Sequence, residues 1–540
     1  MSFDRAEGVQ RLAAGPFDVV VVGGGITGVG CALDAAGRGL RTALVERHDF
    51  ASGTSSKSSK LVHGGLRYLQ QKEVRLVYEA LAERQILRRN APHLVRVLPF
   101  LLPVLTSDGL INKKLARLLG ATMWTYDLTG GLRIGKLHQR ITKDAALEHM
   151  PTLRGSRLAS AYIYYDARAD DARLTLTIAR TAAELGATVV NDAAVVGFEK
   201  NAAGHVQGLR VMVDGSEILV QTRAVVNATG VWSDNVRALD EGRHPDSIRP
   251  AKGVHITVPW TKVRNDIAAV IPVPKDRRSV FVVPWGDFTY IGTTDTDYDG
   301  PLDNPQCTPD DIAYLLRAIN GAITTPISES DILGTWAGLR PLVKRAGSER
   351  TADLSRRHSV TTSESGVVTV TGGKLTTYRR MAADTIDVVS RSLGVRARSR
   401  TARQPLSGAR DWDGGGLPSH LSDRYGSNGH AVVRLEQEQP LLAQPIVPGL
   451  AYSKAEVVYA AREEMARSVD DVLARRTRAR LLARDASADA AREVARLIAP
   501  VLGWNLAEQE ASTAAYRALV DAERTSARLP ETALDAALGA

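Results

Sequence analysis

One segment, residues 17–47, constrains the fold more than any other part of the chain; it reads FDVVVVGGGITGVGCALDAAGRGLRTALVER. Its β-branched run at 19–22 is typical of a buried parallel strand. A helix of small residues is expected over 29–37, and a second strand is expected over 42–45. A strand, a glycine-rich turn, a helix and a second strand in this order predict a Rossmann-like α/β domain.

The glycines of the turn have the spacing G-x-G-x-x-G, which suits a dinucleotide. Gly23 permits the tight turn, Gly25 lets a pyrophosphate approach the backbone, and Gly28 lets the helix pack closely on the strand. The positive helix N-terminus would meet the phosphates, and the Glu46 carboxylate could bind the ribose hydroxyls. A carboxylate disfavours a cofactor with a 2′-phosphate. NAD and FAD carry no such phosphate, and both fit the motif. The alternative is a structural glycine turn in an unrelated α/β protein.

Two later segments, 224–234 and 367–389, repeat the junction of a buried strand with a glycine turn. The junction residues are Ala228, Thr229, Gly230, Gly372 and Gly373. Each turn offers bare backbone N–H groups, and the second of them stands at a predicted helix start. Three such junctions, separated by long insertions, suggest that one cofactor is contacted from several segments; three ordinary strand ends are the alternative.

The stretch 51–69, ASGTSSKSSKLVHGGLRYL, favours FAD over NAD as the cofactor. An NAD dehydrogenase would be expected to continue with regular βα units after the second strand. This chain instead enters a stretch of hydroxyls, glycines and basic residues without strand or helix periodicity. Such a loop could surround a flavin, so the predicted cofactor is FAD.

Several motifs, taken in chain order, resemble those of the FAD-dependent glycerol-3-phosphate dehydrogenases, the respiratory, quinone-linked type. They are VVVVGGGITG, SSKLVHGGLRYL, VNATGVW, KGVHITVP, IGTTDTDY, GLRPL and GGKLTTYR. The resemblance extends from about residue 17 to about residue 520. It implies a Rossmann-like FAD-binding domain with a β-rich substrate (cap) domain, D-amino-acid-oxidase-like, plus a C-terminal all-α domain.

The resemblance also implies an activity. Sn-glycerol 3-phosphate would be oxidised to dihydroxyacetone phosphate by hydride transfer from C2 to FAD, and the electrons would pass to a respiratory quinone. An oxidase that uses oxygen is the first alternative. A flavoprotein that binds nucleic acid is the second, and the basic composition is its only support.

The family's site residues can be carried over onto the matching motifs of this chain. The implied cofactor contacts are Gly23, Gly25, Ile26, Thr27, Gly28, Glu46, Arg47, Thr54, Ser55, Ser56, Ser59, Lys60, Leu61, His63, Gly64, Gly65, Ala228, Thr229, Gly230, Gly372, Gly373, Lys374, Leu375 and Thr376. The implied contacts of the substrate phosphate are Arg67, Tyr68, Arg340, Arg356 and Lys374. The implied catalytic residues are His255, Arg340 and Lys374.

His255 is the candidate general base, since a neutral imidazole could take the proton of the C2 hydroxyl. A histidine that is merely hydrogen-bonded in a strand is the alternative. The chain departs from the family where Arg357 replaces the acidic residue that commonly follows the arginine at position 356, which leaves open whether Arg356 or Arg357 contacts the phosphate. Lys57 stands where relatives often have a small residue, and we expect its side chain to point outwards.

Composition and the resemblance together place three units along the chain. An oxidoreductase module is expected over 17–400, a linker over 401–420 and a helical domain over 421–540. Within the module the FAD-binding segments are about 17–95, 160–235 and 335–400, and the substrate segments are about 96–159 and 236–334. The substrate part alternates like a sheet, with a hairpin turn expected at Gly286 and Asp287.

The helical domain carries two local signals. Ser453 and Glu456 fit an N-terminal capping box. Four arginines form a basic run, which is predicted to be a solvated helix face: Arg475, Arg476, Arg478 and Arg480. The apolar and basic stretch 94–120 has two interpretations, a buried core with a solvated basic face or a patch resting on anionic membrane lipid.

Charge and cysteine content limit the remaining possibilities. A net charge of +9 favours anionic partners, but no nucleic-acid module is present in the sequence. Cys31 and Cys307 are too few for a disulfide framework, and no metal site is expected. We expect a cytoplasmic protein; peripheral contact with the inner face of the cell membrane and a homodimer are left open.

Overall fold

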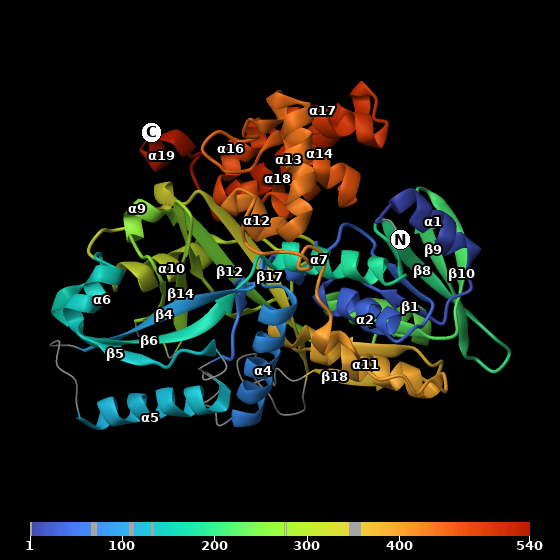
Figure 1. The fold of residues 1–540 in the computed structure, drawn as a ribbon, viewed down its shortest axis with the longest axis horizontal. Coiled ribbons are helices and arrows are strands. Elements are labelled where there is room, and N and C mark those ends of the chain that lie inside the picture. Colours follow the sequence, from blue (N-terminus) through green and yellow to red (C-terminus); the bar gives the residue numbers. More distant parts are fainter. Residues whose placement is uncertain are drawn as a thin grey trace.

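The computed structural model describes residues 3–65, 73–106, 113–130, 134–274, 276, 278–344 and 358–539. Within these residues the strands form a six-stranded, a three-stranded and a ten-stranded sheet. A group of helices from the C-terminal part of the chain, orange to red in Figure 1, lies above both larger sheets. The fold therefore combines two larger sheets and a smaller one with an all-helical C-terminal region.

The six-stranded sheet contains the predicted dinucleotide-binding unit. Its strands are β1 (Val19–Val22), β2 (Thr42–Val45), β7 (Thr188–Val190), β11 (Val225–Asn227), β18 (Ser359–Thr362) and β19 (Val368–Thr371). They follow the order β18-β19-β11-β1-β2-β7, and all neighbours are parallel except β18 and β19. The strand, helix and strand predicted from the sequence are confirmed. The helix begins earlier than expected, because Gly25 already caps it.

Both faces of this sheet are covered, which explains the unbroken apolar run of β1. Val19 and Val21 pack into the core formed with the helices on one face. Those helices are α2 (Ile26–Gly37), α7 (Asp171–Glu184) and α11 (Tyr378–Ser392). Val20 and Val22 pack on the other face against α1 (Arg5–Ala14) and the three-stranded sheet. That sheet consists of β8 (Ala193–Lys200), β9 (Val206–Val213) and β10 (Ser216–Gln221).

The ten-stranded sheet holds most of the predicted substrate part. Its strands are β3 (Leu61–Val62), β4 (Arg96–Leu105), β5 (Gln139–Ile141), β6 (Leu158–Arg168), β12 (Ile248–Pro259), β13 (Ala268–Pro272), β14 (Ser279–Trp285), β15 (Phe288–Gly292), β16 (Thr296–Asp297) and β17 (Gly334–Val343). The hairpin expected at Gly286 and Asp287 is confirmed, since β14 and β15 pair on either side of it.

Further helices come from the segments that connect the strands of the two larger sheets. They are α4 (Val74–Asn90), α5 (Lys113–Gly130), α6 (Lys143–His149), α8 (Ser233–Glu241), α9 (Trp260–Val263) and α10 (Pro309–Asn320). The apolar stretch at 94–105 is largely strand β4, which pairs with β6 and β13. Helix α5 lies along the lower edge of the molecule in Figure 1. None of the described helices is long and apolar enough to cross a membrane.

The C-terminal helices form two cores, and the larger one also contains Phe288 and Leu333 from the region of the ten-stranded sheet. They are α12 (Ser419–Tyr425), α13 (Gly429–Glu438), α14 (Lys454–Glu463), α15 (Ala479–Leu482), α16 (Arg484–Asp489), α17 (Ala491–Leu502), α18 (Leu506–Ala527) and α19 (Leu534–Leu538). The capping box of α14 is confirmed, because the Glu456 carboxylate accepts a hydrogen bond from the Ser453 N–H at 2.9 Å. The boundaries proposed for the units stay predictions.

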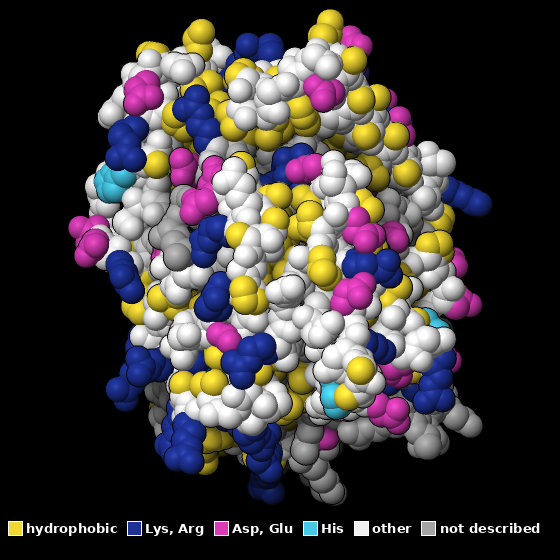
Figure 2. Space-filling model, turned by 90° about the vertical axis from the view of Figure 1, so that its right-hand side faces the viewer, with side chains coloured by type: hydrophobic (Ala, Val, Ile, Leu, Met, Phe, Trp, Pro, Cys, Tyr) yellow, Lys and Arg dark blue, Asp and Glu magenta, His cyan; other side chains and the backbone are white. Residues whose placement is uncertain are grey.

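The prediction for the basic run is wrong. Arg475 and Arg476 belong to a π-helical turn, Asp471–Arg476, and both are buried, as is Arg478. They pair with acidic residues of the FAD-binding part, which periodicity could not reveal. The outer surface differs: Figure 2 shows acidic and basic side chains interspersed over the face that carries α1 and β8–β10.

Candidate functional site

The three strand-to-glycine junctions meet at one edge of the six-stranded sheet. β11 lies between β1 and β19, and Val226 pairs with both Val21 and Val368. All three strands run parallel, so their carboxyl ends and the turns that follow come together. A cavity of about 440 Å³ opens there, within the usual range of ligand cavities of about 300–1,000 Å³. The suggestion that one site is contacted from distant segments is thereby supported.

Most of the predicted cofactor contacts line this cavity, called here the dinucleotide cavity. They are Gly23, Gly25, Ile26, Thr27, Glu46, Arg47, Thr54, Ser55, Ala228, Thr229, Gly230, Gly372, Gly373, Lys374 and Leu375. The N-terminus of α2 opens onto it, and the N–H of Ile26 donates to Ser55 Oγ at 2.8 Å. Bare backbone, a helix N-terminus and a terminal carboxylate are the groups that hold an adenine dinucleotide, so the residues present fit FAD.

Gly23 and Gly28 shape the turn by sterics. Gly23 has a φ of +111°, and a Cβ on it would lie 2.8 Å from the carbonyl oxygen of Ala228. Gly28 does not line the cavity; a Cβ there would lie 1.8 Å from the carbonyl oxygen of Gly23. Its role is therefore the close approach of helix and strand, which the sequence pattern had assigned to it.

Glu46 stands at the tip of β2 and is already part of a local network. Its carboxylate accepts hydrogen bonds from the N–H groups of Gly24 at 2.6 Å and His48 at 2.9 Å. Burial raises the pKa of Glu46, although these hydrogen bonds oppose the change. Arg47 lies 4.6 Å above the Trp232 ring and pairs with Asp303. The hydrogen bond from the Gly24 N–H ties the glycine turn to the end of β2. Glu46 also lines the dinucleotide cavity, so its carboxylate could bind a ribose.

The other predicted contacts lie beyond the dinucleotide cavity. They are Ser56, Ser59, Lys60, Leu61, His63, Gly64, Gly65 and Thr376. The N–H of His63 donates to Thr376 Oγ1 at 3.2 Å, which joins two of the motif segments. The N–H of Gly64 donates to Tyr126 Oη and to Asp166, both at 3.3 Å. The contact of all eight residues with FAD stays a prediction.

Lys57 does not lie as expected, and Lys60 makes an ion pair that the sequence did not predict. The Lys60 side chain is buried, and its ammonium pairs with Asp171 at 3.2 Å instead of lining the dinucleotide cavity. Lys57 was expected to point outwards, but it lines a second cavity of about 630 Å³. Burial lowers the pKa of Lys57 to about 8, and the neighbouring Arg480 contributes. The composition of the loop could not show either partner, because both come from distant segments.

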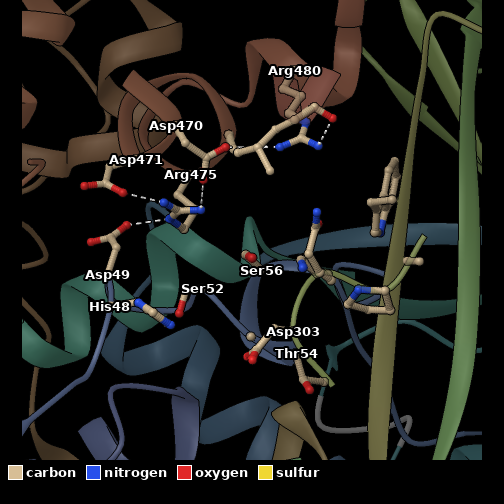
Figure 3. A pocket seen from close by; sticks show the side chains of 18 of the residues that line it. His48, Asp49, Ser52, Thr54, Ser56, Asp303, Asp470, Asp471, Arg475 and Arg480 are labelled. Carbon is tan, nitrogen blue, oxygen red and sulfur yellow. Dashed lines mark hydrogen bonds and ion pairs between the residues drawn. The ribbon is translucent and has the colours of Figure 1, made fainter. Parts of the chain in front are cut away.

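The second cavity lies between the loop after β2 and the C-terminal helices (Figure 3). Arg475 reaches down from those helices to Asp49, and it also contacts Asp470 at 2.7 Å and Asp471. Arg480 pairs with Asp470 at 3.1 Å on the same wall. Most charges around this cavity therefore neutralise one another.

His255 lies on β12, buried beside the loop. Its Nε2 is 2.8 Å from Ser59 Oγ, and its ring stacks on Trp336 with centroids 4.7 Å apart. Burial, followed by the positive charges of Lys60 and Arg340, lowers the pKa of His255 well below its usual value. The imidazole is therefore neutral at physiological pH, the state that can accept a proton.

Arg340 and Lys374 are the basic residues predicted for substrate that the structure describes. Arg340 lies on β17 next to β12, and its guanidinium contacts Asp295 at 3.0 Å and the Thr294 carbonyl at 3.3 Å. Lys374 lies on the wall of the dinucleotide cavity at the start of α11. Arg67, Tyr68 and Arg356 lie outside the described residues, so their assignment stays a prediction.

Some residues on the cavity wall were missed by sequence reasoning. Trp232 and Val231 directly follow the second glycine junction, and their place in the VNATGVW motif was a usable signal. Ala193 to Val195 also line the cavity, at the start of β8. No glycine or polar pattern marks them, and only the turn from β7 into β8 brings them there. Grouped metal ligands are absent from the described residues.

A parallel sheet with a dinucleotide cavity at its carboxyl edge, joined to a sheet that carries a neutral histidine, defines a nucleotide-dependent oxidoreductase. Residues 18–379 match the model of the FAD dependent oxidoreductase family. Residues 399–509 match the C-terminal domain of alpha-glycerophosphate oxidase. The fold and the cofactor are therefore those of an FAD enzyme.

Relatives along the whole chain narrow this class. Glycerol-3-phosphate dehydrogenase 2 of Mycobacterium bovis is 43% identical, covering 98% of this chain and 92% of the relative. The mitochondrial glycerol-3-phosphate dehydrogenase of Homo sapiens is 37% identical, covering 91% of this chain and 71% of the relative. The structure of glycerol-3-phosphate dehydrogenase from Bacillus halodurans complexed with FAD has a TM-score of 0.78, with 29% identity over 96% of this chain and 97% of that chain. The chain belongs to the FAD-dependent glycerol-3-phosphate dehydrogenase family.

Proposed function

We propose that this protein oxidises sn-glycerol 3-phosphate to dihydroxyacetone phosphate. The observation that carries the proposal is the 43% identity, over 98% of the chain, to a protein named glycerol-3-phosphate dehydrogenase. The site supplies the groups that this reaction needs: a dinucleotide cavity, a neutral histidine and basic residues beside it. Bound FAD supplies the hydride acceptor.

His255 takes the proton of the C2 hydroxyl as the carbonyl forms, while the hydride leaves C2. Its low pKa keeps the imidazole neutral until the substrate arrives, so one ring nitrogen can accept a proton. Ser59 Oγ lies 2.8 Å from Nε2, and this contact orients the ring before the reaction. Trp336, stacked on the imidazole, and Tyr290, with its centroid 6.2 Å away, exclude water from the far side. A positioned base of this kind contributes about 10²–10⁴-fold to a rate.

Arg340 and Lys374 hold the substrate phosphate. A guanidinium binds phosphate oxygens through its planar fork, and an ammonium adds a point charge. Arg340 lies on β17, the strand next to β12 of His255, and pairs there with Ala251 of β12. Arg67, Tyr68 and Arg356 complete this phosphate site by family resemblance.

A respiratory quinone accepts the electrons, and the exposed face of α5 supports this. Leu118, Trp124 and Leu128 on this helix are 65%, 53% and 70% exposed, and Leu137 beyond it is also exposed. Exposed apolar residues gathered on one element mark an interaction site, and a membrane surface also holds the quinone pool. Peripheral contact with the inner membrane face follows; the cytoplasmic location and a homodimer stay predictions.

A purified holoprotein assay separates the candidate acceptors. With glycerol 3-phosphate as donor, we expect reduction of a short-chain quinone at least ten times faster than release of peroxide. A peroxide yield equal to substrate consumed, even with quinone present, would instead make the protein an oxidase.

The lipid contact is tested separately, by sedimentation with vesicles of anionic phospholipid. Replacing Trp124 and Leu128 by serine should weaken the binding about 10-fold or more, because two buried side chains contribute about 1.5–3 kcal/mol each. Unchanged binding would remove α5 from the contact.

RNA binding that falls steeply with salt, without flavin reduction by substrate, would favour the nucleic-acid alternative.

A further inference from the structure

The loop between β2 and β3 is held from beneath by a single buried carboxylate. Asp171, at the start of α7, accepts hydrogen bonds from the Ser58 N–H at 2.9 Å and from Ser58 Oγ at 2.7 Å. The same carboxylate pairs with the Lys60 ammonium at 3.2 Å. Asp171 thus contacts two residues of the segment 54–60, called here the flavin loop.

The C-terminal helices supply the cation on the other side of this carboxylate. Arg478 Nη2 contacts Asp171 and also donates to the Ser56 carbonyl at 3.1 Å. Arg478 Nε contacts Asp170 at 3.1 Å. Arg478 is 1% exposed, and its φ of +64° is a conformation that a non-glycine residue adopts only when its surroundings hold it there.

The flavin loop links this cluster to the predicted catalytic histidine. Ser59, between the two residues held by Asp171, contacts His255 Nε2 at 2.8 Å. The carbonyl of Ser58 accepts from Trp336 Nε1 at 3.1 Å, and the carbonyl of Ser59 accepts from Tyr290 Oη at 2.8 Å. Thr54 and Ser55, at the other end of the loop, line the dinucleotide cavity.

We propose that Arg478 is a positioning residue, through which the C-terminal helices fix the flavin loop against FAD and against His255. It acts through Asp171 and the Ser56 carbonyl and touches neither substrate nor the dinucleotide cavity. The inference rests on the proposed function, because the loop is taken to face the flavin. It gives the C-terminal helices a role in the reaction of a site to which they contribute no catalytic group.

The matched control is Arg484. It is also buried in the C-terminal helices, but it pairs with Asp485 at 2.6 Å and with the Pro530 carbonyl at 2.9 Å, both in the same helical region. Arg478→Lys and Arg484→Lys keep the charge and lose the planar fork. Loss of packing should lower the melting temperature of both holoenzymes, so stability alone does not distinguish them.

The experiment measures FAD release from each holoenzyme by flavin fluorescence, together with kcat and KM for glycerol 3-phosphate. Arg478→Lys should release FAD about 10-fold faster and lower kcat about 10-fold with KM within twofold, as coupling of about 1.4 kcal/mol would give. Arg484→Lys should leave all three quantities within twofold of the wild type. Equal behaviour of the two variants would overturn the proposal.

Ser58→Ala provides a second route if Arg478→Lys does not fold. Ser58 and Arg478 depend on the same carboxylate, so Ser58→Ala alone should speed FAD release, and its effect should be non-additive with Arg478→Lys. An unaltered release rate in Ser58→Ala, or strict additivity in the double variant, contradicts the proposal. FAD release needs no substrate, so the result stands even if wild-type protein fails to oxidise glycerol 3-phosphate, which would refute the proposed function alone.

Discussion

The edge of the six-stranded sheet and the junction with the C-terminal helices differ in the groups that line them. The edge is lined by glycines and backbone, with few charged groups, and leaves a cavity. The junction, where the second cavity lies, is lined by buried ion pairs, in which Asp49 contacts both Arg475 and Arg476 and Asp171 contacts Arg478. The edge keeps its hydrogen-bonding groups for a ligand, whereas the junction satisfies its groups internally. Chemistry is therefore expected at the first and positioning at the second.

The largest effect is expected from a side chain added at the edge. Gly28→Ala places a Cβ 1.8 Å from the Gly23 carbonyl oxygen, so the turn cannot form and FAD should not be retained. Gly37→Ala, at the end of the same helix, meets nothing closer than 3.8 Å and should change stability by less than about 1 kcal/mol. Bound flavin per protein, from the visible spectrum, measures both. Stoichiometric FAD in Gly28→Ala would show that the turn tolerates movement.

The next effect concerns the base beside the edge. His255→Asn should lower kcat by about 10²–10⁴-fold, the contribution of a general base, while FAD stays bound. Steady-state kinetics with glycerol 3-phosphate and a quinone measure the loss. Turnover within a few fold of wild type would assign the histidine a structural role in β12.

How far the sequence predicts this molecule differs between the same two regions. The glycine turn, the second strand and the hairpin at Gly286 follow from local patterns, and the structure has them. The arginine run was misread, because an arginine's partner is set by tertiary contact, and the spacing of Arg475 and Arg476 is also compatible with a solvated helix. His255 could be named from its motif, but neither its stacking on Trp336 nor its contact with Ser59 could be.

Removing the Asp49 carboxylate from the junction should lower the stability of the protein. Asp49→Ala leaves Arg475 and Arg476 without their shared carboxylate, and breaking a buried pair of this kind costs about 3–5 kcal/mol of unfolding free energy. Asp521→Ala removes an exposed partner of Arg524 and should cost at most about 1 kcal/mol. Urea unfolding compares the two. Equal midpoints for both variants would mean that the junction contributes no more than a surface pair.

The smallest expected effect is in the pH dependence of the reaction. The pKa of His255 is lowered by burial, so the imidazole stays neutral, and active as a base, at pH values below its ordinary pKa of about 6.5. As the pH falls from 8 to 6, kcat at saturating substrate should therefore change by less than about twofold, and activity should be lost only at a lower pH. A halving of kcat near pH 6.5 would indicate an unshifted histidine.

Flavin reduction by the substrate itself tests the central claim most directly. Under anaerobic conditions, adding glycerol 3-phosphate to the purified yellow holoprotein should bleach its visible absorption completely, with one equivalent of dihydroxyacetone phosphate formed per flavin. Glycerol, which lacks the phosphate, should leave the spectrum unchanged over the same time. Bleaching by glycerol at the same rate, or none by glycerol 3-phosphate, would contradict the assignment of this site.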